Sequence, residues 1–489
     1  MSSRGYKIVL TADRTLMSDY STLFDGMVSA SQTDTVPAFI LKTILAPAPA
    51  VGPDKKVLKA PLGLRRIEAA LSRHGFKRKE IGIFRESELD FAVGEDTAIV
   101  AVSSGDPAGL GMNSSTMEAL YGGTIHNKHF FRQLLAKISS LKKNGLKFKT
   151  VVGGPGAWQL LGDKEFEADH IICGYCEGNV SGLFKDIIHH RAAKELEGRN
   201  PEPGEIPHIL GPSSMGVVET SRGCGMGCAF CTLKDTPMIH LPESTILADI
   251  EANISGGNRN IALISEDFFR YGSASFAVPA PEKLIDLLTE IRSKTRTKLI
   301  QTDHVNIATA GAYSDNELKE VASLIGGSHE RDYIWLNLGI ETPSERLLKE
   351  NRAGGKMLLP EGKNWEAFSL EQIKRLSGFG FFPLISVIIG LPGETEEDAL
   401  CLERFIDKLK DAKASVFPLY YTAIENKSKT GINPAKKKIY GRIMKKSYSL
   451  NFKWVPKMYW ENQNLAGVNK ARMLMLQFMG KGQRLIMKY

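Results

Sequence analysis

Short apolar runs alternate with amphipathic segments in the N-terminal part of the chain. Each run has the length of a buried strand, and the segments between them carry apolar residues three and four positions apart, as on one face of a helix. Strands and helices that alternate in this way form parallel sheets covered by helices. The pattern therefore predicts an N-terminal α/β domain with a Rossmann-like, doubly wound sheet. The predicted strands are 6–11, 81–84, 97–103, 149–152 and 170–173, and the predicted helices are 61–74 and 130–143.

A second series of strands follows a segment that is rich in charge and proline. Residues 191–212 contain four prolines and predict an interdomain linker. The strands after it again alternate with helical segments, which predicts a partial (β/α)6 barrel with its ligands at the carboxyl ends of the strands. The predicted strands are 215–220, 261–265, 298–302, 335–340, 384–389 and 415–420, and the predicted helices are 244–254, 281–292, 316–325 and 396–409.

These patterns predict three domains: 1–205 with the linker, 206–423 for the barrel, and 424–489 for a C-terminal extension. Charge sets the extension apart, because it holds 15 Lys and Arg against two Glu, a balance of +13. The whole chain carries +8, so the rest of the chain carries −5. Aromatic residues lie between the basic ones. The pattern favours a basic, aromatic cap that folds back on the acidic body over a surface for RNA or another acidic partner, and leaves both open.

Three of the six cysteines lie within one loop, residues 223–231. The CxxxCxxC spacing of Cys224, Cys228 and Cys231, among three glycines, allows three thiolates to bind three irons of a 4Fe–4S cluster and leaves the fourth iron open. A structural zinc ion would need a fourth ligand, and none follows at a suitable spacing. For the CxxC of Cys173 and Cys176 we expect a packing role.

The composition also bears on the compartment. Six cysteines in 489 residues are too few for a disulfide framework, and a thiolate-bound cluster needs a reducing environment. No stretch approaches the roughly 18 apolar residues of a membrane-spanning helix. We therefore expect a cytoplasmic protein, and the oxygen sensitivity of an exposed cluster suggests an anaerobic host.

The cysteine loop, with an aromatic residue before its last cysteine, resembles the signature of radical S-adenosylmethionine (SAM) enzymes. The resemblance implies that SAM binds the open iron and is cleaved to a 5′-deoxyadenosyl radical. Three strand ends, at 265–269, 339–352 and 388–395, resemble the motifs with which this family contacts the amino group, the ribose and carboxylate, and the adenine of SAM. The implied SAM-binding residues are Phe230, Glu266, Asp267, Glu341, Arg352, Gly390 and Leu391.

Segments of the N-terminal domain, at 60–64, 151–155 and 168–172, resemble the cobalamin-binding domain found in many radical SAM enzymes. Glycines there allow the backbone to approach a flat macrocycle, and short polar side chains can bond its amides. The Asp-x-His-x-x-Gly motif of other cobalamin proteins is absent, and Ala108 stands where its histidine would be. The implied cobalamin-binding residues are Ser103, Ser104, Asp106, Gly153, Gly154, Pro155 and Gly178.

Together the resemblances imply a cobalamin-dependent radical SAM methyltransferase that methylates an unactivated sp3 carbon, with a 4Fe–4S cluster, SAM and cobalamin as cofactors. We hypothesise that the acceptor is a protein or peptide residue, with glutamine suspected, and that a flavodoxin or ferredoxin supplies electrons. Two alternatives stay open. One is a methylthiotransferase acting on tRNA, which would need a second three-cysteine cluster, and the other is a cobalamin- or cluster-sensing binding protein. The sequence assigns no catalytic side chain.

Overall fold

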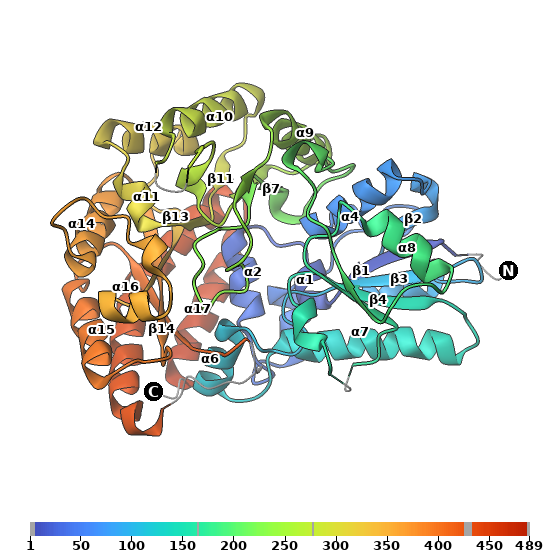
Figure 1. Ribbon diagram of the computed structural model, residues 1–489, viewed down its shortest axis with the longest axis horizontal. Helices are drawn as coiled ribbons and strands as arrows, with labels where there is room; N and C mark the ends of the chain where they lie inside the picture. Colours follow the sequence, from blue (N-terminus) through green and yellow to red (C-terminus); the bar gives the residue numbers. More distant parts are fainter. Residues whose placement is uncertain (1–4, 164–165, 276–277, 425–432, 487–489) are drawn as a thin grey trace. The chain divides into compact units, whose positions relative to one another are not determined.

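The computed structural model describes residues 5–163, 166–275, 278–424 and 433–486. The chain forms two compact units, which are drawn in Figure 1. None of the described helices is both long and apolar enough to cross a membrane. The first unit comprises Met1–Glu118, Gly122–Val218 and Leu241–Asn258, and the second comprises Ala119–Tyr121, Glu219–His240 and Arg259–Tyr489.

The first unit contains a six-stranded parallel sheet with the strand order β2-β1-β3-β4-β5-β6. The order changes direction between β1 and β3, which is the place where doubly wound sheets bind their ligands. The predicted doubly wound α/β fold is therefore confirmed. The strands are β1 (Ile8–Ala12), β2 (Ile81–Ile83), β3 (Ile99–Ser103), β4 (Lys149–Gly153), β5 (His170–Cys173) and β6 (Glu195–Glu197).

Successive residues of a strand point to opposite faces of the sheet, and helices cover both faces. Val9 and Val100 join one hydrophobic cluster with residues of α7, whereas Ile8 and Ile99 join a second cluster with residues of α4 and α8. The longer helices are α4 (Leu62–Arg73), α6 (Met112–Tyr121), α7 (His126–Lys143) and α8 (Val180–Ile188). Shorter ones are α1 (Arg14–Met17), α2 (Leu23–Ala30), α3 (Ala38–Ile40), η1 (Leu41–Leu45), η2 (Arg78–Glu80), η3 (Glu86–Glu88), α5 (Leu89–Ala92), η4 (Ala157–Leu160), η5 (Pro203–Glu205) and η6 (Ser214–Gly216).

The interpretation of 191–212 as a linker is wrong. This segment supplies β6, which pairs with β5, and it buries Ile206 and Ile209 in the first unit. The pattern concealed the strand because Leu196 is its one apolar residue, between two glutamates. Such polar strands are common at sheet edges, where charge discourages pairing with another chain.

The strands of the predicted barrel form two sheets, in the orders β11-β10-β7 and β12-β13-β14-β15. Each predicted barrel strand is present, and the third is divided into β11 and β12. The strands are β7 (Val217–Glu219), β10 (Asn260–Ile264), β11 (Leu299–Gln301), β12 (His304–Val305), β13 (Ile334–Glu341), β14 (Phe381–Ile389) and β15 (Ser415–Tyr420). The helices are α10 (Pro281–Lys294), α11 (Ile307–Gly311), α12 (Asp315–Gly326), α13 (Glu345–Glu350), α14 (Trp365–Gly378) and α15 (Glu396–Lys408), with the short turns η7 (Phe268–Arg270), η8 (Gly354–Lys356) and η9 (Pro434–Lys436).

Helix α9 (Glu243–Ser255) follows the cysteine loop in sequence but belongs to the first unit. Arg66 of α4 donates from Nη1 to Oδ1 of Asp249 at 3.0 Å, and also to the carbonyl of Pro207 at 2.6 Å. The Arg66 and Asp249 side chains are 2% and 0% exposed. Asp249 also accepts a hydrogen bond from the backbone of Ile209 at 2.9 Å. A buried ion pair therefore fixes α9 to α4.

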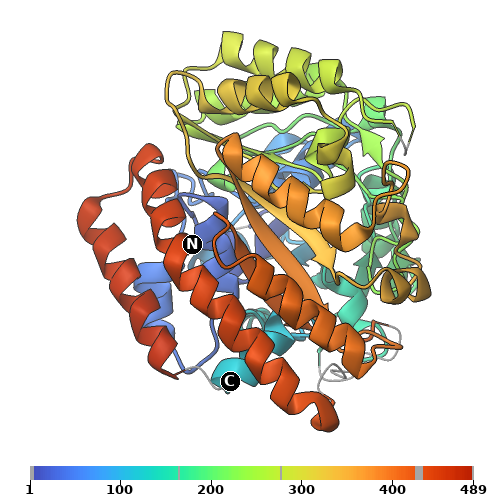
Figure 2. The ribbon, with the colours of Figure 1, turned by 90° about the vertical axis from the view of Figure 1, so that its left-hand side faces the viewer.

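The basic extension forms two helices, α16 (Lys437–Leu465) and α17 (Lys470–Ile486), which lie side by side in Figure 2. Helix α16 packs on α15 and on the edge strand β15. Its Asn451 bonds both backbone groups of Val416 on that strand, at 2.8 and 2.7 Å. Arg442 and Lys446 pair with Glu403 of α15. The extension thus covers a sheet edge and uses part of its positive charge on acidic residues of the barrel.

Candidate active site

The cysteine loop is closed at its base by a short antiparallel pair, β8 (Ser221–Arg222) and β9 (Ile239–His240). Gly223, Gly225 and Gly227 have φ values of 75°, 74° and 70°, a left-handed backbone that favours glycine. A Cβ at Gly223 would clash with the carbonyl oxygen of Pro237, which lies just before β9. These tight turns bring the three cysteines of the loop near one another.

The thiols of Cys224, Cys228 and Cys231 interact electrostatically with one another, and all three are free of disulfides. Burial raises the pKa of each thiol, that of Cys228 to about 11, while the positive charge of Lys356 acts in the opposite direction. Without a metal the neutral thiols would be the stable form. A metal that binds thiolates reverses this balance.

The donor set fits a 4Fe–4S cluster better than a single ion. Within the described ranges, no three His, Cys, Asp or Glu side chains converge on one point that could hold a metal ion. The cysteines of a 4Fe–4S cluster each bind a different iron, so they need not converge on one point. Three thiols on a glycine-rich loop, that of Cys228 buried and the other two half-buried, match this requirement and leave one iron without a protein ligand.

Two adjacent carboxylates follow β10, and the structure gives them different surroundings. Asp267 is fully buried, and its carboxylate accepts from the backbone of Asn306 at 3.1 Å and from the hydroxyl of Thr309 at 2.8 Å. Burial raises the pKa of Asp267 to about 6. Glu266 is exposed, yet desolvation by surrounding residues raises its pKa. Glu266 is therefore accessible to a ligand, whereas Asp267 holds α11 against β10.

Glu341 ends β13 in a strained backbone conformation. Its φ is 61°, and the pairing of β13 with β14 shifts register between Gly339 and Glu341. Such bulges and left-handed residues often direct functional side chains. Lys356 donates from Nζ to the Glu341 carboxylate at 2.6 Å and to the Gly339 carbonyl at 3.0 Å. The carboxylate that was predicted to contact the SAM ribose is thus held by a lysine.

Lys356 is the functional candidate that the sequence analysis missed. Its charge acts on Cys224, Cys228 and Glu266 as well as on Glu341. Although burial alone would lower the pKa of Lys356, Glu341 and Cys228 raise it, so the amine stays protonated. No motif marks this position, because the lysine reaches the site from a turn after β13. A glycine pair just before it is the one local signal.

The predicted carboxylate partner of SAM, Arg352, has φ 54° and an exposed side chain. Among the described residues no hydrogen bond or ion pair joins this side chain to Glu341 or Lys356. The preceding residue, Asn351, connects two parts of the site: its carbonyl accepts from Ala229 in the cysteine loop at 3.0 Å, and its Nδ2 donates to Pro392 at 2.9 Å. Asn351 was also missed from the sequence.

The remaining predicted SAM residues belong to the frame of the site. Phe230 and Leu391 are buried. Gly390 has φ 79°, and its backbone nitrogen donates to Glu394 at 2.9 Å. This bond closes the turn after β14. Glu394, which belongs to the same motif at 388–395, therefore fixes the conformation of that turn. Phe230 and Leu391 can exclude water from beneath a ligand.

We expect Gly339→Ala to disrupt the Glu341–Lys356 pair, because a Cβ would lie 2.5 Å from the Glu341 carboxylate and 2.6 Å from Lys356 Nζ. The flexible side-chain ends can shift, so the free energy of unfolding should fall by only about 1–3 kcal/mol. Equilibrium dialysis of the cluster-loaded protein should show weaker SAM binding. Gly378→Ala is the matched control, because nothing lies within 4 Å of its Cβ. Equal SAM affinity in both variants would contradict the expectation.

In the first unit, four predicted cobalamin residues meet at the carboxyl ends of β3 and β4. Ser103 pairs in register with Gly153, and the Ser104 hydroxyl donates to Asp13 at the end of β1 at 2.9 Å. Gly154 has φ 93°, and a Cβ there would lie 2.5 Å from the Ser103 hydroxyl. The structure therefore brings these residues together at the carboxyl ends of β3 and β4, next to the place between β1 and β3 where the strand order changes direction.

Asp106 shapes its own loop. Its carboxylate accepts from the Gly111 backbone at 3.1 Å, from Gln159 at 2.6 Å and from the Ser114 hydroxyl. Ala108, which stands in place of the motif histidine, is buried and donates its backbone N–H to Gln159 at 2.9 Å. This network leaves Asp106 with little capacity for a further ligand.

The other two cobalamin candidates lie apart from this network. Pro155 is exposed. Gly178 donates to the Arg199 carbonyl at 3.1 Å, and a Cβ at Gly178 would lie 2.7 Å from that oxygen. The close approach of the chain after β6 therefore explains this glycine without a cofactor. Cys173 and Cys176 are half-buried and form no disulfide.

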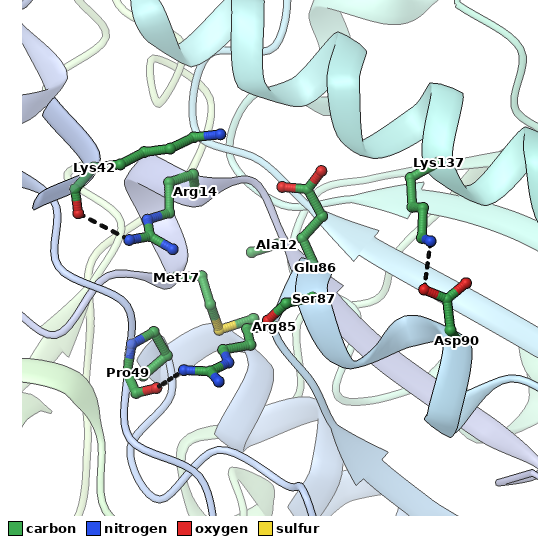
Figure 3. Close-up of a pocket in the computed structure, with 10 residues that line it drawn as sticks. All are labelled: Ala12, Arg14, Met17, Lys42, Pro49, Arg85, Glu86, Ser87, Asp90 and Lys137. Carbon is green, nitrogen blue, oxygen red and sulfur yellow. Dashed lines mark hydrogen bonds and ion pairs between the residues drawn. The ribbon is translucent and has the colours of Figure 1, made fainter. Parts of the chain in front are cut away.

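A pocket of about 370 Å³ opens beyond the carboxyl ends of β1 and β2 (Figure 3). Arg14 donates to the Lys42 carbonyl at 3.0 Å, and Arg85 donates to the Pro49 carbonyl at 2.9 Å. On the other side of the pocket, Lys137 pairs with an acidic residue. No sequence motif marks these residues, because they come from four separate segments of the chain. The lining carries four basic residues, Arg14, Lys42, Arg85 and Lys137, and two acidic residues, Glu86 and Asp90.

The family model of the radical SAM superfamily matches residues 218–422. This range contains the three loop cysteines and every predicted SAM-binding residue. Residues 218–422 are therefore similar to a radical SAM domain, a kind of enzyme domain that uses a 4Fe–4S cluster and SAM.

Two curated relatives are named as methylthiotransferases. The chain is 25% identical over 295 residues to the ribosomal protein uS12 methylthiotransferase RimO of Anaeromyxobacter sp. (strain Fw109-5), which covers 58% of this chain and 57% of that protein. It is 28% identical over 303 residues to the protein of the same name from Myxococcus xanthus (strain DK1622), with 58% and 56% covered. The chain spans about half the length of the curated relatives it matches.

Solved structures of a radical SAM methyltransferase, TsrM from Kitasatospora setae, share the fold. The structure with tryptophan and a SAM analogue has a TM-score of 0.53 and 14% identity, and covers 86% of this chain and 75% of that chain. The structure with cobalamin and a [4Fe-4S] cluster has a TM-score of 0.52 and 15% identity, and covers 86% and 77%. This coverage includes parts of both units.

Proposed function

We propose that the chain is a cobalamin-dependent radical SAM methyltransferase that acts on an unactivated sp3 carbon. One observation carries the proposal. The CxxxCxxC region similar to radical SAM domains occurs in the same chain as a separate doubly wound unit, and in that unit glycine and serine residues lie at the carboxyl ends of β3 and β4. The fold of the whole chain is similar to that of TsrM, a methyltransferase solved with cobalamin and a cluster.

In this proposal separate sets of residues bind and orient each cofactor. When bound, the cluster and SAM supply a hydrogen-abstracting 5′-deoxyadenosyl radical, and cobalamin supplies a methyl group. Cys224, Cys228 and Cys231 would hold three irons. Glu266 would accept from the SAM ammonium group, and Glu341 from the ribose hydroxyls. Lys356 donates to the Glu341 carboxylate and orients it, which makes Lys356 a positioning residue.

The first unit would hold cobalamin at the carboxyl ends of β3 and β4, where Ser103, Ser104, Gly153 and Gly154 lie. The absence of side chains at the two glycines supports close approach of a flat ring. The basic pocket of Figure 3 suits the phosphate of the nucleotide tail. The loop around Ala108 carries no histidine, so the lower face of cobalt would have a neighbour from elsewhere.

The proposed acceptor is a protein residue. The curated relatives are named for a ribosomal protein substrate, which supports a macromolecular acceptor. Lys437, Lys438 and Lys445 of the extension are exposed, so positive charge remains available for an acidic partner. A glutamine of methyl-coenzyme M reductase is the finer proposal for this acceptor; the unusual segment 11–37 alone suggests it.

A methylthiotransferase is the second candidate, because the curated relatives carry that name. Such an enzyme needs a second three-cysteine cluster, and outside the loop the sequence offers only Cys173, Cys176 and Cys401. Cys401 lies on α15 of the second unit, which leaves two cysteines for a cluster in the first unit. The third candidate, a cobalamin- or cluster-sensing binding protein, would have no use for SAM-cleaving chemistry.

Product analysis separates these candidates. We expect the reconstituted full-length protein, incubated anaerobically with SAM, hydroxocobalamin and a strong reductant, to form both 5′-deoxyadenosine and S-adenosylhomocysteine. The second product requires methyl transfer to the corrin, so it should disappear when cobalamin is left out. A binding protein would form neither product. Formation of S-adenosylhomocysteine at an unchanged rate without cobalamin would favour the methylthiotransferase.

A further inference from the structure

The third barrel strand breaks at its carboxyl end, and Asp303 and His304 lie at the break. Strand β11 pairs with β10, whereas β12 begins at His304 and pairs with β13. The chain therefore passes from one sheet to the other between these strands. His304 lies between the strand ends that carry Glu266 and Glu341, the two carboxylates of the candidate active site.

Asp303 fixes the imidazole ring. Nδ1 of His304 lies 3.1 Å from Asp303 Oδ1, which also accepts from Nδ2 of Asn337 at 2.8 Å. The Asn337 backbone nitrogen donates to the Asp303 carbonyl at 3.0 Å, and Asn337 is the register partner of His304 on β13. Because Nδ1 is used, Nε2 is the ring nitrogen that remains for a ligand.

The His304 side chain is half exposed, whereas that of Asp303 is 24% exposed. Crowding by neighbouring residues alone would lower the pKa of His304, but Asp303 and then Glu266 raise it to about 9, against the charge of Lys356. The ring is therefore protonated near neutral pH, and the half-exposed side chain offers an Nε2–H donor. A surface histidine held in this way, with three charged neighbours, is preorganised for an acceptor oxygen.

We propose that the Asp303–His304 pair is an oxygen-binding site at the end of the barrel, where the Nε2–H of His304 donates to a carboxylate or carbonyl oxygen. The proposal rests on the proposed function, because it assumes that SAM and an acceptor bind at these strand ends. This oxygen can belong to either of two groups: the methionyl carboxylate of SAM, or an amide or carboxylate group of the acceptor. His304 is a positioning residue in either case.

The test uses the full-length, cluster-loaded protein with ¹⁵N-labelled histidines, and His304→Gln identifies the resonance. The pKa of His304 should lie near 9 in the parent protein and near 6.5 in Asp303→Asn, which removes the charged partner. Three probes are added: SAM, decarboxylated SAM, and N-acetylglutamine methylamide. A response to SAM without a response to decarboxylated SAM assigns the site to the methionyl carboxylate. A response to the amide probe assigns it to the acceptor.

Binding gives the second readout. If SAM is the source, His304→Phe should weaken SAM binding about tenfold or more, because it removes a charge-assisted hydrogen bond, and His304→Gln should retain part of the affinity. Binding of decarboxylated SAM should stay unchanged in both variants. If none of the three probes shifts the resonance and both variants bind SAM like the parent, the pair is only structural and the proposal is overturned. A parent protein that forms 5′-deoxyadenosine in that case would leave the proposed function intact.

Discussion

Replacing Cys224, Cys228 and Cys231 together by alanine is expected to abolish iron and sulfide binding and the formation of 5′-deoxyadenosine. These are the three thiols of the glycine-rich loop, and a 4Fe–4S cluster with one open iron needs all of them. Colorimetric iron and sulfide analysis and chromatography of the nucleoside products measure the two effects. Cys401→Ala is the matched control, because that thiol lies on α15, and it should leave both measurements unchanged.

The loss should be chemical and not structural. The loop is held by backbone hydrogen bonds, including those from Cys224 to Thr236 at 3.0 Å and from Ala229 to Asn351 at 3.0 Å. These bonds do not depend on the thiols, so the circular dichroism spectrum of the triple variant should match that of the cluster-free parent. Retention of iron and sulfide in the triple variant would show that the cluster is bound elsewhere.

Asp249→Ala should lower the free energy of unfolding of the first unit by about 3–5 kcal/mol, because it leaves Arg66 as an unpaired charge in the interior. Arg66 is 2% exposed, so water cannot replace the lost carboxylate. The Ile209 backbone loses its acceptor as well. Urea unfolding followed by hydrogen exchange of α4 and α9 measures the effect, since two units need not unfold together.

Two controls sharpen this prediction. The double variant Arg66→Met, Asp249→Leu removes both charges and should recover most of the lost stability, because apolar pairs often replace buried ion pairs without cost. Glu397→Ala breaks the exposed pair with Arg404 on α15 and should have no measurable effect. If Asp249→Ala were as stable as Glu397→Ala, the buried pair would not fix α9 to α4.

The elements that could be predicted from the sequence are those in which a local pattern and burial agree. The strand β15 is an apolar and aromatic run after its first residue, Ser415, and helix α12 starts at a Ser314–Glu317 capping box. Strand β6 escaped detection because an edge strand does not need an apolar pattern. The division of the third barrel strand into β11 and β12 escaped detection because pairing partners are a property of the whole sheet.

The residues of the candidate active site could likewise be predicted only in part from the sequence. The cysteines could be found because a cluster fixes their spacing within one loop. Lys356 and Asn351 could not, because each reaches the site from the turn after β13 and acts through contacts that only the fold creates. The sequence also treated Glu266 and Asp267 as equivalent, whereas burial makes one of them a structural acceptor.

Retention of cofactors by one and the same chain tests the central claim most directly. After anaerobic reconstitution with iron, sulfide and hydroxocobalamin, followed by desalting, the optical spectrum and mass analysis should show about four irons and one corrin per chain. The corrin should remain in the triple cysteine variant, because the two cofactors belong to separate units. A parent protein that holds the cluster but retains no corrin would contradict the assignment of a cobalamin-dependent methyltransferase.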